Sequence, residues 1–250
     1  MTSTLPARAP RLSGARALFT GRAGGVSTGD RAALNLARHV GDDPDAVERN
    51  RQRVAAAIGA PLVFVDQVHS AEVHVVAGPT GGHDAGEVPV VSADALVTRR
   101  ADVALAIMVA DCLPVLLADP VAGVVGAAHA GRAGLLDGVL EATISEMRAL
   151  GSRPEDLTAS IGPSICGACY EVPAAMREEA ATRLPATRAR TRWGTPALDL
   201  RAGAISVLRS AGVPPAAIDA EHPCTREDES LFSYRRQAST GRFAGVIRRT

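Results

Sequence analysis

The sequence contains no lysine, so all 27 of its basic residues are arginines. Mechanisms that depend on a lysine amine, such as Schiff-base formation or a phosphate-binding P-loop, are therefore excluded. The 27 basic residues are balanced by 27 acidic ones, and the formal net charge is zero. Since no overall field favours nucleic acid or an anionic membrane, the expected partner is a small molecule.

Cysteine is scarce, and long hydrophobic runs are missing. Four cysteines in 250 residues are too few for a disulfide scaffold and suit a reducing compartment. The first twenty residues lack the apolar core of a secretory signal. No apolar run approaches the roughly 18 residues that a membrane-spanning helix needs. These absences predict a soluble, cytoplasmic protein that does not contact membranes.

The composition is that of a globular protein, with 46% hydrophobic residues. A chain of 250 residues can bury a core of useful size. Glycine-punctuated strands alternate with helices, and neither a repeat nor a change of composition marks a linker. We expect a flexible lead-in over residues 1–14 and a single catalytic domain over residues 15–250.

The most informative part of the chain holds two apolar segments, residues 104–109 and 124–128. Apolar runs of this length, bounded by turn residues, are typical of strands buried on both faces. Residues 115–117 are predicted to form a third, short strand between them. Cys112 follows the first strand, and His129 ends the last one. A thiol and an imidazole at neighbouring strand ends are expected to face one pocket.

Two glycine-rich segments flank polar side chains. Gly131 and Gly134 follow His129, where they would allow a close backbone approach before a helix begins. Residues 21–30 form a glycine-dense loop whose backbone N–H groups, with Arg22, could hold an anion. The alternative for this loop is a tight surface turn.

The remaining elements follow from periodicity and from capping residues. Asp43 as N-cap and Pro44 at the first helical position predict the start of a helix that Gly59 ends. Further helices are expected over residues 135–150, 173–184 and 202–211. Further strands are expected over residues 15–20, 62–65, 73–76, 157–161, 218–221 and 241–247.

Two more sets of possible ligands stand out. His69 and His74 lie five residues apart in extended chain and point to opposite faces, so at most one of them joins a given site. Cys166 and Cys169 have CxxC spacing, which suits a redox pair or half of a zinc site. No second CxxC completes a structural zinc site, and the neighbouring glycines and proline already explain a turn.

The residues alone leave two chemical hypotheses open, beside a purely structural role for Cys112 as a small buried side chain. In the first, His69, Cys112 and His129 bind a metal ion whose free position activates water or an anion. In the second, His129 deprotonates Cys112, which attacks a carbonyl group as a nucleophile.

An ordered set of short motifs covers nearly the whole chain, from Gly21 to Ile247. They are GGVS, LNL with HVGDD, QVHS, ADALVT, ADCLPVLL, AAHAG, GPSIC-GACYEV, LDL, PCT and FSYRRQ-TGR-AGVI. In this order the chain resembles the YfiH-like family. Members of that family have been described as laccase-domain or multicopper polyphenol oxidases, as purine nucleoside phosphorylases and as peptidoglycan editing factors.

The resemblance implies a mixed α/β fold, usually monomeric, in which packed mixed sheets are flanked by helices. It places the metal ligands of the family on His69, Cys112 and His129, and it implies zinc, although copper has been claimed. The implied activity is phosphorolysis of adenosine, inosine and methylthioadenosine to a free base and a sugar 1-phosphate. Deamination of adenosine is implied as a second activity.

The family match narrows the search for substrate contacts. Either Arg235 or Arg236 is a candidate anion binder, together with Arg22 and the nearby glycine backbone. Asn35 offers a donor and an acceptor for a ribose or a base edge. Asp111, beside the proposed metal cysteine, is expected to orient that ligand or to carry a proton in catalysis.

The chain departs from the family pattern at two places. Where the family usually reads HAGWRG, this sequence reads HAGRAG, so the tryptophan is lost and Arg132 is left as the candidate to reach the substrate pocket. In the CxxC segment only Cys169 matches the family, which argues against a catalytic role for Cys166.

The leading hypothesis is a zinc-dependent nucleoside phosphorylase with deaminase activity. One alternative is copper oxidation of phenols, which six singly scattered histidines argue against. Others are a Cys-His hydrolase that edits peptidoglycan precursors and, last, a non-enzymatic scaffold.

Overall fold

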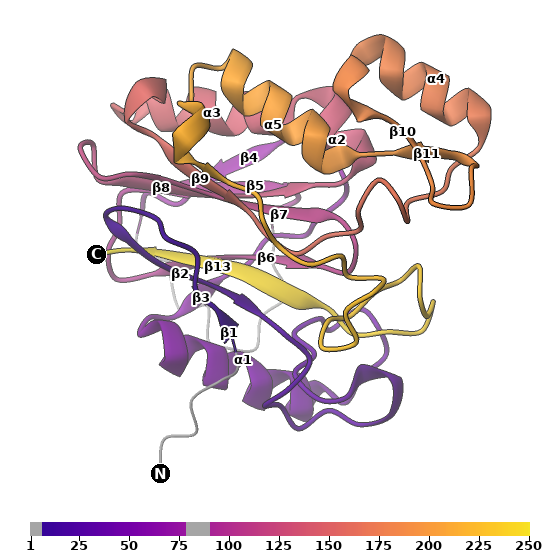
Figure 1. Ribbon diagram of the computed structural model, residues 1–250. Coiled ribbons are helices and arrows are strands. Elements are labelled where there is room, and N and C mark those ends of the chain that lie inside the picture. Colours follow the sequence, from indigo (N-terminus) through magenta and orange to yellow (C-terminus); the bar gives the residue numbers. More distant parts are fainter. Residues whose placement is uncertain (1–6, 79–90) are drawn as a thin grey trace.

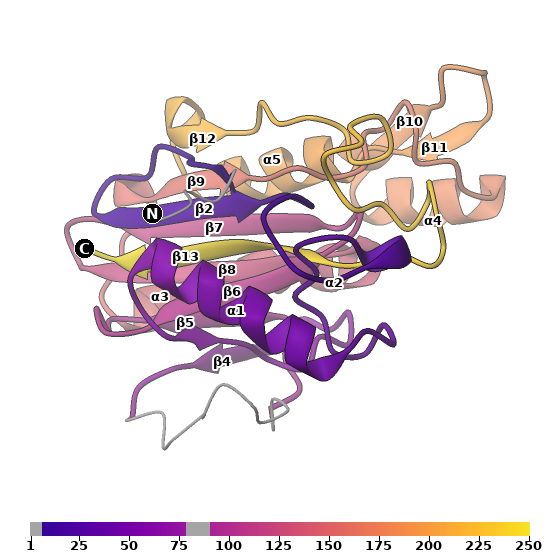
Figure 2. The same cartoon turned by 90° about the horizontal axis from the view of Figure 1, so that it is seen from below.

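The computed structural model describes residues 7–78 and 91–250, and these residues form four layers (Figure 1). Helix α1 (Pro44–Ile58) covers the outer face of a five-stranded sheet, and Figure 2 shows it lying across that face. A six-stranded sheet packs on the inner face. The outer layer consists of α2 (Arg132–Asp137), α3 (Val139–Ala149) and α5 (Leu200–Ser210). This arrangement confirms the predicted fold class of mixed sheets packed together and flanked by helices.

Both large sheets mix parallel and antiparallel strands. The five-stranded sheet has the order β1 (Ala7–Arg8), β2 (Ala15–Thr20), β13 (Phe243–Arg249), β6 (Ala104–Val109) and β3 (Leu62–Val63). The six-stranded sheet has the order β12 (Ile218–Asp219), β9 (Thr158–Ile161), β7 (Leu113–Asp119), β8 (Val124–Ala130), β5 (Ala95–Thr98) and β4 (Val73–Val75). Helix α4 (Ala174–Arg183) packs beside a two-stranded sheet of β10 (Arg188–Arg190) and β11 (Pro196–Leu198).

Strands at the centre of each sheet are buried on both faces because they separate two apolar layers. On β6, Leu105 and Ile107 point into the core between the sheets, whereas Ala106 and Met108 point into the core beneath α1. Alternate side chains of a strand face opposite sides, so both sets must be apolar. This explains why the central segments read as continuous hydrophobic runs.

Local signals predicted most boundaries, but one predicted helix is divided into two in the structure. Helix α1 begins as expected, with the Asp43 side chain accepting a hydrogen bond from the Asp45 backbone N–H and Gly59 closing the helix at φ 82°. The helix expected over residues 135–150 begins earlier and is split into α2 and α3, because Gly138 takes a left-handed φ of 94°.

The described part of the N-terminal lead-in begins with a strand. Residues 1–6 lie outside the described residues. Residues 7 and 8, expected to be flexible, form β1 against Thr20 and Phe19 of β2. Arg8 also pairs with Asp228 at 3.0 Å, which ties this segment to the distant loop before β13.

Three connections that pass from one large sheet to the other carry residues to the same pocket. They are the segment between β3 and β4, the short link between β6 and β7, and the long segment between β12 and β13. At such crossings the backbone leaves the hydrogen-bonded sheet, so its side chains are free to point into a cavity.

Candidate metal centre and pocket

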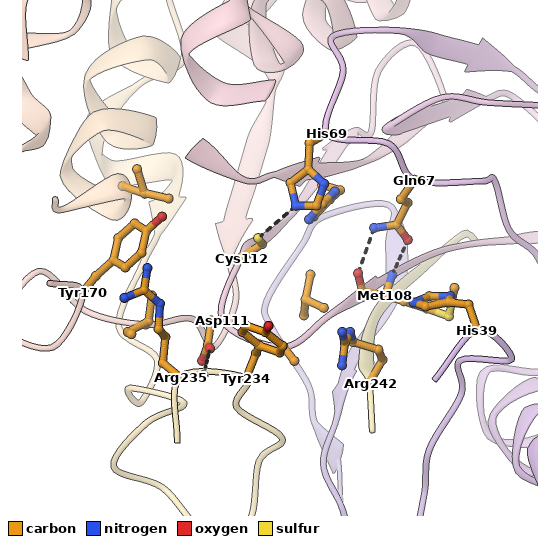
Figure 3. Close-up of a pocket in the computed structure, with 15 residues that line it drawn as sticks. His39, Gln67, His69, Met108, Asp111, Cys112, Tyr170, Tyr234, Arg235 and Arg242 are labelled. Carbon is orange, nitrogen blue, oxygen red and sulfur yellow. Dashed lines mark hydrogen bonds between the residues drawn. The ribbon is translucent and has the colours of Figure 1, made fainter. Parts of the chain in front are cut away.

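Three possible metal ligands meet at the pocket that these connections border. His69 lies on the β3–β4 crossing, Cys112 on the β6–β7 crossing, and His129 near the end of β8. Their ligand atoms lie within 4.8 Å of one another, and Cys112 Sγ is 3.8 Å from His69 Nε2 (Figure 3). The two imidazole rings meet edge to face, with centroids 4.7 Å apart. The structure thus brings together the three residues that the sequence proposed as ligands.

A buried carboxylate, Asp94, holds two of these three residues in place. One of its oxygens lies 2.7 Å from His129 Nδ1, which leaves Nε2 of that ring as the ligand atom. The same carboxylate accepts hydrogen bonds from the backbone N–H groups of Val68, His69 and Ser70. These bonds stabilise the left-handed backbone of His69, whose φ is 65°.

Asp94 remains ionised in this setting. Burial by itself raises the pKa of its carboxyl group, but hydrogen bonds from His129 and Ser70 outweigh burial and lower the pKa to about 2. Asp94 lies just before β5 within the ADALVT motif, but sequence reasoning assigned no role to it. Its position beneath two histidines is a product of the fold.

The backbone passes so close to the ligands at Gly131 that a side chain does not fit. A Cβ atom at this position would lie 2.7 Å from His69 Cδ2 and 3.2 Å from Cys112 Sγ. The backbone itself is ordinary there, with φ −74° and ψ 174°, so the restriction is purely steric. The predicted close approach of this glycine-rich segment is confirmed.

We expect Gly131→Ala to lower zinc affinity at least about tenfold, because the new methyl group must push His69 or Cys112 out of position. Overpacking of this kind costs about 1–3 kcal/mol of unfolding free energy. Zinc titration against a competing chelator, with thermal unfolding, measures both effects. The matched control is Gly78→Ala, because no atom of the described residues lies within 4 Å of a Cβ there. Equal affinities in the two variants would contradict the steric argument.

The donor set fits a zinc ion. Tetrahedral zinc ligands at about 2.3 Å for sulfur and about 2.0 Å for nitrogen lie roughly 3.5 Å apart. The observed separation of 3.8 Å between Cys112 Sγ and His69 Nε2 is close to that value. Three protein ligands leave a fourth position for a reactant, which is the pattern of catalytic zinc sites.

The thiol of Cys112 is also suited to bind a cation. Burial raises its pKa, but the charge of His129 and hydrogen bonds from His129 and His69 reverse the effect and lower the pKa to about 6. In turn, burial lowers the pKa of His129, whereas the Cys112 thiolate and Asp94 raise it to about 9. Without a cation both shifts favour a thiolate beside an imidazolium.

The possible ligands border a cavity of about 390 Å³, which is within the usual range for small-molecule sites. Its walls carry side chains suited to a flat, anionic ligand: the rings of Tyr170 and Tyr234 and the guanidinium groups of Arg235 and Arg242 (Figure 3). His39 lies beside Arg242, and burial followed by the charge of Arg242 lowers its pKa. Of these five residues, sequence reasoning proposed only Arg235.

Asp111 and Arg235 are fixed to each other at one side of the cavity. The Asp111 carboxylate accepts hydrogen bonds from the Thr225 hydroxyl at 2.6 Å and from the Arg235 backbone N–H at 2.7 Å. The Arg235 guanidinium lies 4.8 Å above the Tyr170 ring and donates to the Glu171 carbonyl. Asp111, at φ 94°, therefore shapes the turn that presents Cys112.

Four other candidates are not among the residues that line the cavity. Arg22 donates to the Ala32 carbonyl and lies over the Phe232 ring. Arg132 is the first residue of α2. Arg236 donates to the carbonyls of a loop, among them that of Thr225 at 2.6 Å.

Asn35, the fourth, is completely buried, with its amide engaged by the protein. It donates to the Ala37 carbonyl and to Asp42, and its oxygen accepts from the backbone N–H groups of Ala37 and Arg242. Its contact with the cavity is indirect, through the position of Arg242.

Taken together, the chain is a mixed α/β protein with a candidate His-Cys-His metal centre beside a pocket for a small molecule. Residues 16–250 match the model of the family described as multi-copper polyphenol oxidoreductase laccase, and the chain belongs to that family. It is 51% identical over 242 residues to purine nucleoside phosphorylase ORF3 of Streptomyces griseus, covering 96% of each chain.

Two further relatives agree with this placement. Purine nucleoside phosphorylase SCO2081 of Streptomyces coelicolor is 49% identical over 240 residues, covering 94% of this chain and 96% of the relative. The crystal structure of YlmD from Geobacillus stearothermophilus superimposes with a TM-score of 0.87 at 35% identity, covering 94% of this chain and 92% of that one. No helix in the described part of the chain has the length and hydrophobicity to cross a membrane.

Proposed function

We propose that this protein is a zinc-dependent purine nucleoside phosphorylase. The observation that carries the proposal is the meeting of three metal-ligand side chains with two arginines and two tyrosines around one cavity. Relatives about half identical to the chain, named purine nucleoside phosphorylases, support the same activity. The substrates are then a nucleoside and inorganic phosphate, and neither nucleic acid nor membrane is involved. We further propose that the protein acts as a monomer in the cytoplasm.

The cavity residues divide naturally between the two substrates. Tyr170 and Tyr234 offer aromatic surfaces for a purine, and Arg235 and Arg242 offer cationic donors for phosphate. Burial lowers the pKa of Arg242, and a bound anion offsets the cost of keeping this partly buried guanidinium charged. Holding both reactants in one cavity makes the reaction between two substrates effectively unimolecular.

In phosphorolysis, a phosphate oxygen forms a bond to the anomeric carbon as the bond from that carbon to the base nitrogen breaks. The electron pair of the broken bond leaves with the base, which then takes up a proton. A zinc ion on His69, Cys112 and His129 would supply a Lewis acid that stabilises the developing negative charge. Arg235 and Arg242 hold the phosphate, and Asp94 keeps His129 in the tautomer whose Nε2 faces the site.

Deamination of adenosine is proposed as a second activity of the same site. It replaces the exocyclic amine of the purine by oxygen from water and releases ammonia. It shares the metal and the purine pocket with phosphorolysis but does not use phosphate.

The test is an assay of purified protein with inosine and phosphate. We expect hypoxanthine and ribose 1-phosphate in equal amounts, loss of both products without phosphate or after chelation, and recovery when zinc is added. Adenosine should release ammonia whether or not phosphate is present. Absence of hypoxanthine under every condition would refute the phosphorylase.

The set of ligand residues favours zinc over the copper that the family description suggests. Laccase chemistry needs imidazole-rich sites and more than one copper ion. Among the described residues, His39, His74 and His222 are absent from the ligand clusters, which include only His69 and His129. One sulfur and two imidazoles suit zinc, and the other ligand cluster found among the described residues contains no histidine to bind the further copper ions that a laccase needs.

One observation favours a second candidate, a hydrolase of peptidoglycan precursors. Cys112, His129 and Asp94 are arranged as a nucleophile, a base and an orienting carboxylate, with His129 Nδ1 2.7 Å from Asp94. Such an enzyme would work without metal. Turnover of a muramyl precursor by chelated protein, abolished by alkylation of Cys112, would establish it over the phosphorylase.

A further inference from the structure

A second cluster of possible ligands lies outside the cavity. The CxxC segment after β9 brings Cys166 and Cys169 beside Cys224 of the long β12–β13 connection. The ligand atoms of these three residues and of Glu227 lie within 4.8 Å of one another. All three thiols are free, so no disulfide accounts for their meeting. Because Cys224 is 55 residues from the nearer of the other two, its place here is a product of the fold.

We propose that Cys166, Cys169, Cys224 and Glu227 form a second zinc site, which is structural rather than catalytic. Tetrahedral zinc holds thiolates about 3.8 Å apart, so shifts of less than about 1 Å complete the site. Four protein ligands leave no position for a reactant, which is the pattern of structural zinc sites.

The backbone around the cluster is arranged like that of a metal site. The Cys166 N–H donates to Cys224 Sγ at 3.4 Å, a bond that stabilises a thiolate ligand. The backbone N–H groups of Cys169 and Tyr170 both donate to the Cys166 carbonyl, which closes the tight CxxC turn. Ser164 and Cys224 form an isolated parallel bridge that joins the two segments.

The charges near the cluster also suit a bound cation. Three thiolates and a carboxylate carry four negative charges, of which a zinc ion neutralises two. Arg192 lies against the same groups, with Nη2 2.8 Å from Cys169 Sγ and an ion pair to Glu227. Arg226 donates to the Cys169 carbonyl at 3.2 Å. The two arginines therefore balance the charge that remains.

Both segments of the cluster also support the catalytic pocket. The Ile165 N–H donates to the Asp111 carbonyl at 2.9 Å, and the Thr225 hydroxyl donates to the Asp111 carboxylate at 2.6 Å. Asp111 directly precedes Cys112. A zinc ion that locks the two segments together would hold the turn presenting the catalytic cysteine.

Elemental analysis of protein produced with zinc tests the proposal separately from the catalytic site. We expect two zinc ions per chain in the unmodified protein, one in Cys112→Ser, one in Cys224→Ser and close to none in the double variant. Loss of all zinc in Cys112→Ser, or the same content in Cys224→Ser as in the unmodified protein, would overturn the second site. The phosphorylase proposal fails independently, through the Cys112 site and the nucleoside assay.

Two further measurements guard against a variant that merely misfolds. Cobalt added to Cys112→Ser protein should give thiolate-to-metal charge-transfer absorption that saturates at one equivalent, and its absence would overturn the proposal. Glu227→Gln should weaken this binding at least about tenfold, whereas Glu229→Gln, two residues away and also exposed, should not. Thiol titration of denatured protein should count four thiols; a count of two would reveal a disulfide in place of the metal.

Discussion

Replacing Cys112 by serine is expected to lower kcat/KM for inosine phosphorolysis at least about a thousandfold. A serine hydroxyl stays protonated at neutral pH and is a poor zinc ligand, so the metal and its Lewis-acid contribution of several kcal/mol are lost. Each 1.36 kcal/mol of transition-state stabilisation corresponds to a factor of ten, so about 4 kcal/mol gives this loss. Initial rates of hypoxanthine release, measured with metal content, test the prediction.

The histidine ligand offers a matched comparison. His69→Gln should show a similar loss of activity and metal, because His69 Nε2 lies 3.8 Å from Cys112 Sγ. His74→Gln should leave both unchanged, since His74 lies on β4 outside the cavity and outside both ligand clusters. Full activity in Cys112→Ser protein would remove the metal-dependent mechanism. Equal losses in the two histidine variants would show that the effect is not specific to the site.

The hydrophobic pattern was sufficient to predict the central strands and the reactive side chains that stand at their ends. Residues 104–109 and 124–128 are apolar at every position because each strand separates two cores, and this leaves few alternatives to a buried strand. Cys112 and His129 follow directly from that assignment. His69 was already the strongest candidate for the third ligand because it interrupts a buried strand, and the resemblance to a family strengthened that choice. Its loop has no periodicity that would fix the direction of the side chain.

Residues that approach the site from far along the chain could not be predicted in this way. Asp94, just before β5, meets His129 of β8 through a side-chain hydrogen bond. Arg242 comes from the position just before β13, where its backbone N–H donates to Asn35. Asn35 was proposed for a ribose because its amide can donate and accept, but the fold uses both functions internally. Residue chemistry therefore limits possible roles, and tertiary contacts select among them.

The CxxC segment shows the same limit. Its spacing predicted at most half of a zinc site, and the sequence offered no second pair to complete it. The missing thiol comes from a single cysteine, Cys224, in a loop that crosses between the sheets. Only the three-dimensional structure brings such a residue to the other two.

We expect Asp94→Asn to weaken zinc binding at the catalytic site about 10- to 100-fold while leaving the second cluster loaded. An asparagine amide has one accepting oxygen in place of two, and its NH₂ group would face N–H donors that the carboxylate now satisfies. His129 would lose the partner that fixes its tautomer. Removing the hydrogen-bond partner of a metal-bound histidine lowers metal affinity about 10- to 100-fold. Zinc titration against a chelator measures the change.

The same substitution should also destabilise the fold, which separates it from a purely local effect on the metal. Hydrogen bonds to a buried charge contribute about 1.5–3 kcal/mol each, and Asp94 is fully buried. We therefore expect the metal-free variant to lose about 3 kcal/mol of unfolding free energy. Asp102→Asn is the control, because that carboxylate is exposed and, within the described parts of the chain, pairs with Arg100 at the surface. If Asp94→Asn binds zinc as tightly as the control does, the carboxylate does not position His129, and the metal centre must be organised by the backbone alone.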